Sequence, residues 1–273
     1  MNIKNVHYVF FSPTGTTQAA IRAVGNGTGR TAGQMLDITV GAPEGAIPFT
    51  KEDLVIVGMP VYSGRLPGLA VERFRAIGGK NTPVVPIVVY GNRAYDDALV
   101  ELSDLCAAQG LHTVAAGAFI GEHSFSTVEF PIAVDRPDGE DLQYAEQFGS
   151  RITQLLDTCE SVAQLALPEL PGNRPYKSAM QPVPVATCTD PQACTQCGKC
   201  VACCPTQGIR MTDAGPVTEA DNCIWCMACV RNCPTNARRV SLAKINDSAL
   251  RLHNACKARQ EPECFLASVS ATT

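Results

Sequence analysis

The chain has 273 residues, 45% of them hydrophobic and 18% charged, which is typical of a globular protein and excludes an intrinsically disordered one. Its 26 acidic and 22 basic residues are mixed along the sequence and give a net charge of −4, so we expect no nucleic-acid partner. The longest apolar runs are too short to cross a bilayer and the first residues show no export signal, so we expect a cytoplasmic protein with no membrane span.

Residues 1–160 alternate strand and helix patterns, which predicts an α/β domain with a doubly wound parallel sheet of five strands. The third and fourth strand candidates are continuous apolar runs, as expected where helices cover both faces of a sheet. In such sheets, ligands bind at the carboxyl ends of the strands. The expected strands are 6–11, 35–40, 54–59, 84–90 and 113–120, and the expected helices are 16–24, 67–77, 95–109 and 141–157.

The first strand runs into the sequence FFSPTGTTQAA, which opens a helix. A loop of glycine and small hydroxyl residues leaves backbone N–H groups free at the positive end of a helix, and this arrangement suits a phosphate. The loop has no P-loop lysine, which argues against a nucleoside triphosphate with magnesium. Simple helix capping is the alternative. The candidate phosphate-binding residues are Ser12, Thr14, Gly15, Thr16 and Thr17.

The next two strand ends carry loops that suit a flavin ring. Together with the phosphate loop they resemble flavodoxins, in which loops at these positions sandwich the isoalloxazine ring of FMN, usually with an aromatic side chain. The resemblance covers the whole first domain and implies bound FMN, with Tyr62 and Tyr95 as stacking residues ahead of Tyr90. The candidate residues in these loops are Pro60, Val61, Tyr62, Ser63, Gly64, Tyr90, Gly91, Asn92 and Tyr95.

Two features leave questions open. Flavodoxins commonly surround their flavin with acidic groups, whereas Arg65 and Arg93 lie in the two sandwiching loops here, so a very low flavin potential does not carry over. The segment Glu122-His123-Ser124 follows the fifth strand; its histidine either borders the flavin or is a hydrogen-bonded structural residue.

The 14 cysteines are the strongest signal, because disulfides are rare in a reducing compartment and metal or redox chemistry is the expected use. CTQCGKCVACCP and CIWCMACVRNCP repeat one pattern at a constant offset of 29 residues, which indicates an internal duplication. Cys-x2-Cys-x2-Cys-x3-Cys-Pro is the spacing of iron–sulfur ligands, and structural zinc sites use CxxC pairs instead. The aligned cysteines are Cys194, Cys197, Cys200 and Cys204, and Cys223, Cys226, Cys229 and Cys233.

Over about 50 residues this region closely resembles bacterial two-[4Fe–4S] ferredoxins, in which each run lends its last cysteine to the other cluster. The resemblance implies a small α+β domain with two clusters. Cys203 does not keep the repeat register, so we expect it to be a small buried residue. The implied ligand sets are Cys194, Cys197, Cys200 and Cys233 for one cluster, and Cys223, Cys226, Cys229 and Cys204 for the other.

The whole chain resembles the flavodoxin–ferredoxin fusions of anaerobic bacteria and archaea. We expect a flavodoxin-like domain at 1–160, a proline-rich linker at 161–187, the ferredoxin domain at 188–242, and a helix at 246–259 within a C-terminal tail, 243–273. An electron carrier exchanging with redox protein partners is the preferred function, since no catalytic constellation is visible. The alternative is an FMN-dependent reductase of a small molecule or quinone that receives its electrons through the clusters. A homodimer stays open.

Overall fold

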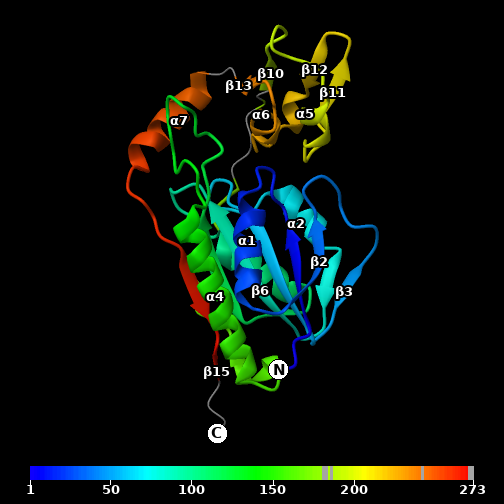
Figure 1. Cartoon of the computed structure of the whole chain (residues 1–273), viewed down its shortest axis with the longest axis vertical. Helices are drawn as coiled ribbons and strands as arrows, with labels where there is room; N and C mark the ends of the chain where they lie inside the picture. Colours follow the sequence, from blue (N-terminus) through cyan, green and yellow to red (C-terminus); the bar gives the residue numbers. More distant parts are fainter. Residues whose placement is uncertain (180–183, 185–186, 241–242, 270–273) are drawn as a thin grey trace.

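The computed structural model describes residues 1–179, 184, 187–240 and 243–269, and side chains are described in all of these except 243–245. A large domain built on one sheet carries a smaller domain at one end, drawn in yellow and orange in Figure 1. Part of the expected linker, 180–183 and 185–186, lies outside the described residues. No helix in the described residues is long and apolar enough to span a membrane.

The large domain is a flavodoxin-like α/β fold. Five parallel strands lie in the order second, first, third, fourth, fifth along the chain, which is the flavodoxin order. Their apolar residues face both layers of helices, so the sheet is covered on each side. The strands are β2 (Thr31–Asp37), β1 (Asn5–Phe10), β4 (Asp53–Pro60), β6 (Thr82–Tyr90) and β8 (Ala115–Ile120).

Two helices cover each face of this sheet. On one face α1 (Thr16–Gly27) packs on α4 (Gly139–Asp157), and the other face carries α2 (Gly68–Phe74) and α3 (Ala98–Ala108). Helix α4 begins with a capping box: the Asp138 carboxylate accepts hydrogen bonds from the first-turn amides. The five strands and four helices predicted from the sequence are thus confirmed as elements.

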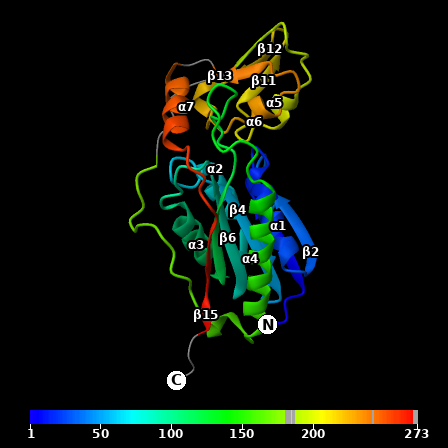
Figure 2. The same cartoon turned by 60° about the vertical axis from the view of Figure 1, so that its left-hand side comes forward.

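The sheet also holds two strands that the sequence pattern did not predict, which brings it to seven. Strand β7 (Leu111–Thr113) pairs with β6, and β14 (Glu263–Leu266), from the C-terminal tail, pairs antiparallel with β8. Figure 2 shows this red tail running down from α7 to the edge of the sheet. Small pairs lie outside the sheet: β3 (Ile47–Phe49) with β5 (Ile77–Gly79), and β9 (Leu165–Ala166), which follows the 3-10 turn η1 (Val162–Gln164), with β15 (Ser268–Val269).

The small domain is α+β and shows the duplication in its backbone. Helices α5 (Lys199–Ala202) and α6 (Ala228–Arg231) are offset by the same 29 residues as the cysteines. Each follows a residue in the left-handed conformation, Gly198 and Met227. The other elements are β10 (Thr187–Thr189), paired with β13 (Arg238–Val240), β11 (Ile209–Thr212), paired with β12 (Gly215–Thr218), and the 3-10 turn η2 (Ala220–Asn222).

The remaining described segments are helix α7 and the first part of the linker. Helix α7 (Ala243–Ala255) begins three residues before the predicted helix and ends four residues before it. The described part of the linker lies along α3, where Asp97 accepts hydrogen bonds from the backbone amides of Asn173 and Lys177. This half of the linker is therefore held against the large domain by specific polar contacts.

Candidate cofactor sites

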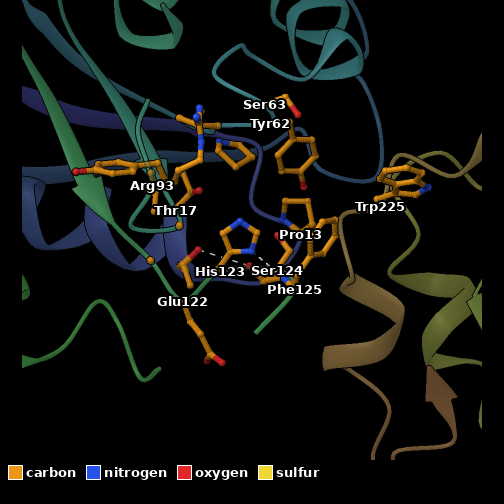
Figure 3. A pocket seen from close by; sticks show the side chains of 18 of the residues that line it. Pro13, Thr17, Tyr62, Ser63, Arg93, Glu122, His123, Ser124, Phe125 and Trp225 are labelled. Carbon is orange, nitrogen blue, oxygen red and sulfur yellow. Dashed lines mark hydrogen bonds between the residues drawn. The ribbon is translucent and has the colours of Figure 1, made fainter. Parts of the chain in front are cut away.

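A cavity of about 200 Å³ lies at the carboxyl ends of the strands, where the topology places ligand sites. Loops after β1, β4, β6 and β8 line it, and Ile224, Trp225 and Leu252 close it from the small domain and α7 (Figure 3). The predicted residues that line it are Thr14, Thr16, Thr17, Pro60, Val61, Tyr62, Ser63, Gly64, Tyr90 and Gly91.

The loop after β1 fits an anionic group. Gly15 adopts φ 86°, a left-handed conformation that turns the chain into α1. The Ser12 hydroxyl accepts the Gln18 amide at 3.1 Å, so it satisfies one N–H near the start of α1, and Ser12 does not line the cavity. Among the described residues the first-turn amides of Thr16 and Thr17 have no partner, and the buried Thr17 hydroxyl has none either. These donors at the positive end of α1 suit a phosphate.

The loop after β4 places an aromatic ring in the cavity. Tyr62 and Arg65 exchange backbone hydrogen bonds of 2.9 and 3.2 Å across a tight turn, with Ser63 and Gly64 at positive φ. Burial raises the pKa of Tyr62 well above its usual value, and the nearby thiols of Cys226 and Cys223 add to the effect. Tyr62 therefore lies between the cavity and the small domain.

The two arginines of these loops have different positions. The Arg65 guanidinium donates two hydrogen bonds of 2.7 Å to the Glu101 carboxylate and does not line the cavity. Arg93 does line it, and pairs with Asp96 at 2.5 Å. Only Arg93 therefore brings positive charge to the cavity from these loops.

The loop after β6 differs from the expectation at two positions. Tyr90 and Gly91 line the cavity, whereas Asn92 and Tyr95 are buried outside it. The Asn92 amide donates to the carbonyls of Cys256 and Ala258 at 2.8 Å, and the Tyr95 hydroxyl donates to Glu263 at 3.0 Å. The C-terminal tail thus turns both side chains away, and Tyr95 is not positioned to stack on a ring in the cavity.

The loop after β8 contributes residues whose role the sequence left open. His123 lines the cavity with Glu122, Ser124 and Phe125, and its Nδ1 accepts the Phe125 amide at 3.0 Å, which leaves the proton on Nε2. Burial, with help from Arg93 and Arg231, lowers the pKa of His123 to about 4, so the ring is neutral at pH 7. A Cβ on Gly91 would lie 2.3 Å from this ring, so only glycine fits beneath it.

Two further cavities in the small domain are lined by cysteines from both runs. The cysteines that line them are grouped as in the sets that the ferredoxin resemblance implies: Cys204 joins Cys223, Cys226 and Cys229, and Cys233 joins Cys194, Cys197 and Cys200. No group of three or more His, Cys, Asp or Glu in the described residues converges as around a single metal ion. The thiolates of a cubane bind different irons, so they need not converge on one point.

The remaining cysteines stand apart from these cavities. Cys203 lines neither of them; it is half-buried, not fully buried as expected, and partial burial raises the pKa of its thiol to about 12. Cys188 lies in β10 with its thiol directed at the Arg239 carbonyl, and Cys264 lies in β14.

The cavity of the Cys223 run adjoins the flavin-compatible cavity. Ile224 and Trp225 line both, and Trp225 faces Phe125 across the boundary with ring centroids 6.5 Å apart. Arg231 of α6 donates to the Glu122 carboxylate at 2.7 Å and to the carbonyls of the same loop. Arg73 of α2 donates to the Pro205 carbonyl at 2.7 Å. The two domains are therefore docked around these cavities.

Sequence comparison supports the assignment of the small domain. Residues 186–234 match the family model of the 4Fe-4S dicluster domain. The chain is a flavodoxin-like domain fused to a 4Fe-4S dicluster region. Comparison with curated proteins found no match.

Solved structures similar to this fusion protein align with its first domain. A flavodoxin from the domain Archaea is 14% identical over 56% of this chain and 99% of its own, with a TM-score of 0.36. The flavodoxin, WrbA-like protein from Agrobacterium tumefaciens is 16% identical over 57% of this chain and 98% of its own, with a TM-score of 0.39. The flavodiiron protein from Giardia intestinalis is 17% identical over 57% of this chain and 37% of its own, with a TM-score of 0.35. The strand order itself, and not these scores, defines the fold.

Proposed function

We propose that this protein is an electron carrier that passes electrons between FMN, bound at the strand ends, and two [4Fe–4S] clusters, and that it exchanges electrons with redox protein partners. The observation that carries the proposal is the shared wall between two cavities: Ile224 and Trp225 line both the flavin-compatible cavity and the cavity of the Cys223 run. Two cofactors in these cavities would be separated by a single layer of side chains.

Different residues bind the flavin and the two clusters. The amides of Thr16 and Thr17 and the Thr17 hydroxyl hold the FMN phosphate, and Tyr62 covers one side of the ring. The two sets of four cysteines hold the clusters. When bound, FMN exchanges electrons singly or in pairs and each cubane exchanges them singly.

The two cluster sites differ in their exposure to solvent, and this difference suggests separate roles in electron transfer. In the set next to the flavin, Cys226 and Cys229 are buried and neither Cys204 nor Cys223 is exposed. In the other set Cys197 is exposed, and its neighbours Thr195 and Gln196 are exposed too. We assign the site of the Cys194 run to exchange with protein partners, because electron transfer to a partner needs a close approach to solvent.

The test is anaerobic rapid mixing. The clusters are reduced first, and flavin reduction is then followed at several protein concentrations. A concentration-independent rate supports transfer within one chain or a stable oligomer, and a rate proportional to concentration refutes the relay. Mixing Cys204→Ser chains with chains stripped of flavin then shows whether a homodimer passes electrons between subunits.

The reductase alternative has an observation of its own. The Nε2–H of the neutral His123 ring, the Glu122 carboxylate and Arg93 all lie at the cavity, and together they offer polar contacts to a small substrate. Turnover of a quinone or of NAD(P)H by the purified protein, without a protein partner, would favour this function over the carrier.

A further inference from the structure

The duplication allows Trp225 to be compared with the residue at the equivalent position of the other cysteine run. It is the only tryptophan of the chain, and the offset of 29 residues aligns it with Gln196. Both residues have positive φ, 58° and 54°, so the ligand loops share one backbone conformation. Gln196 is exposed and polar, which shows that the loop conformation does not require a tryptophan.

The backbone amides of both residues donate a hydrogen bond to the cysteine two residues earlier. The Gln196 amide donates to the Cys194 sulfur at 3.4 Å, and the Trp225 amide donates to the Cys223 thiol. The indole is therefore an additional group that only the run next to the flavin cavity carries.

The indole N–H of Trp225 has no acceptor of its own. Its Nε1 atom is buried, and no hydrogen-bond partner exists for it among the described residues. In Figure 3 this nitrogen lies on the side of the ring away from His123 and Pro13, toward the small domain. Burying a donor without a partner is unfavourable, so the arrangement points to an acceptor on that side.

We propose that the Trp225 indole N–H donates a hydrogen bond to a sulfur of the cluster held by Cys204, Cys223, Cys226 and Cys229. Trp225 lines that cavity, and cluster sulfurs are the acceptors that a cubane presents. A hydrogen bond to sulfur favours the more negative, reduced cluster. Trp225 thus raises the potential of this cluster relative to the value the cluster would have without the indole N–H. The inference rests on the proposed function, because it needs a cluster at this site.

The first experiment uses the unmodified sequence. Because the chain holds one tryptophan, growth with ¹⁵N-indole labels a single side-chain nitrogen. Pulsed electron paramagnetic resonance then measures nitrogen coupling to the reduced clusters. We expect ¹⁵N coupling in the signal of one of the two reduced clusters. Absence of ¹⁵N coupling in a protein with its full iron content would overturn the inference.

The second experiment compares Trp225→Phe with Gln196→Ala, its matched control at the duplicate position. Trp225→Phe keeps an aromatic ring and removes the N–H. We expect one cluster to become about tenfold harder to reduce, a shift of about 59 mV for a one-electron couple, with no shift in Gln196→Ala. Unchanged midpoints in Trp225→Phe would also overturn the inference. If the purified chain assembles no cluster, its iron and sulfide content shows that the proposed function has failed, and the inference fails with it.

Discussion

Arg231 provides the sharpest test of domain docking. Its guanidinium donates to the Glu122 carboxylate at 2.7 Å and to the His123 and Ser126 carbonyls at 3.3 and 3.4 Å. Arg231→Ala removes all three hydrogen bonds, and because alanine is a good helix former, helix α6 is retained. The variant should therefore weaken the contact between the domains without disturbing the cysteine loops.

The magnitude follows from burial. A hydrogen bond to a charged group contributes about 1.5–3 kcal/mol when it is well formed. The two side chains are 33% and 20% exposed, so solvent screening lowers the value to about 1–2 kcal/mol. That is roughly a 5- to 30-fold fall in the ratio of docked to undocked domains. Arg73 and the contact between Phe125 and Trp225 remain in the variant.

Hydrogen exchange measures this ratio directly at the amides of residues 122–126, and rapid mixing measures electron transfer in the same samples. Arg239→Ala is the matched control, since Arg239 pairs with Asp190 at 3.4 Å in the same domain but away from the boundary, with its side chain 64% exposed. We expect faster exchange and slower flavin reduction in Arg231→Ala alone. Equal exchange in the two variants would refute the docking argument.

Three further variants test the binding sites and the fold. Thr17→Val removes the buried hydroxyl and should weaken FMN binding about 10- to 100-fold, measured by flavin titration; unchanged binding would move the phosphate elsewhere. Cys204→Ser should damage one cluster and Cys203→Ser neither, and equal iron loss in both would mean that the ligand choice is wrong. Asp141→Asn removes the nearer of the two carboxylates that pair with the buried Arg136 and leaves only Asp138, 3.9 Å away. It should lower the free energy of unfolding by up to about 3–5 kcal/mol in a urea titration, and a change within error would show that Asp138 compensates the charge.

The sheet and its helices could be predicted because their signals are local. Strands such as β6 are buried along their whole length, and continuous apolar runs mark them. The edge strand β2 shows the limit of this reasoning. Its residues Thr31–Asp37 are mostly exposed, whereas the predicted strand, 35–40, followed the apolar letters that include Ile38, a buried loop residue. A pattern of apolar residues shows which positions are buried. At the edge of a sheet the buried positions do not coincide with the strand, so the pattern misplaces the strand boundaries.

The orientation of two predicted flavin contacts could not be read from local sequence. Asn92 and Tyr95 bond to groups more than 160 residues further along the chain, in the tail that ends with β14. That strand has only four residues, and its side chains are half-buried or exposed, so no periodic pattern marks it. Without the tail, an aromatic residue next to a strand end is a reasonable stacking candidate. With it, the ring is part of the contact between tail and sheet.

The cysteine spacing revealed the duplication, and the resemblance to ferredoxins implied the two cysteine sets, but spacing alone is symmetric between the two runs. What distinguishes them is the pair of residues between the first two cysteines of each run: Thr195 and Gln196 in one run, Ile224 and Trp225 in the other. The polar pair is exposed, and the apolar pair lines the boundary with the flavin-compatible cavity. Two large apolar side chains in a short loop between cysteines have no core of their own to enter. They therefore indicate a surface that packs against another domain. The aligned polar pair of the other run shows that the loop itself does not require apolar residues.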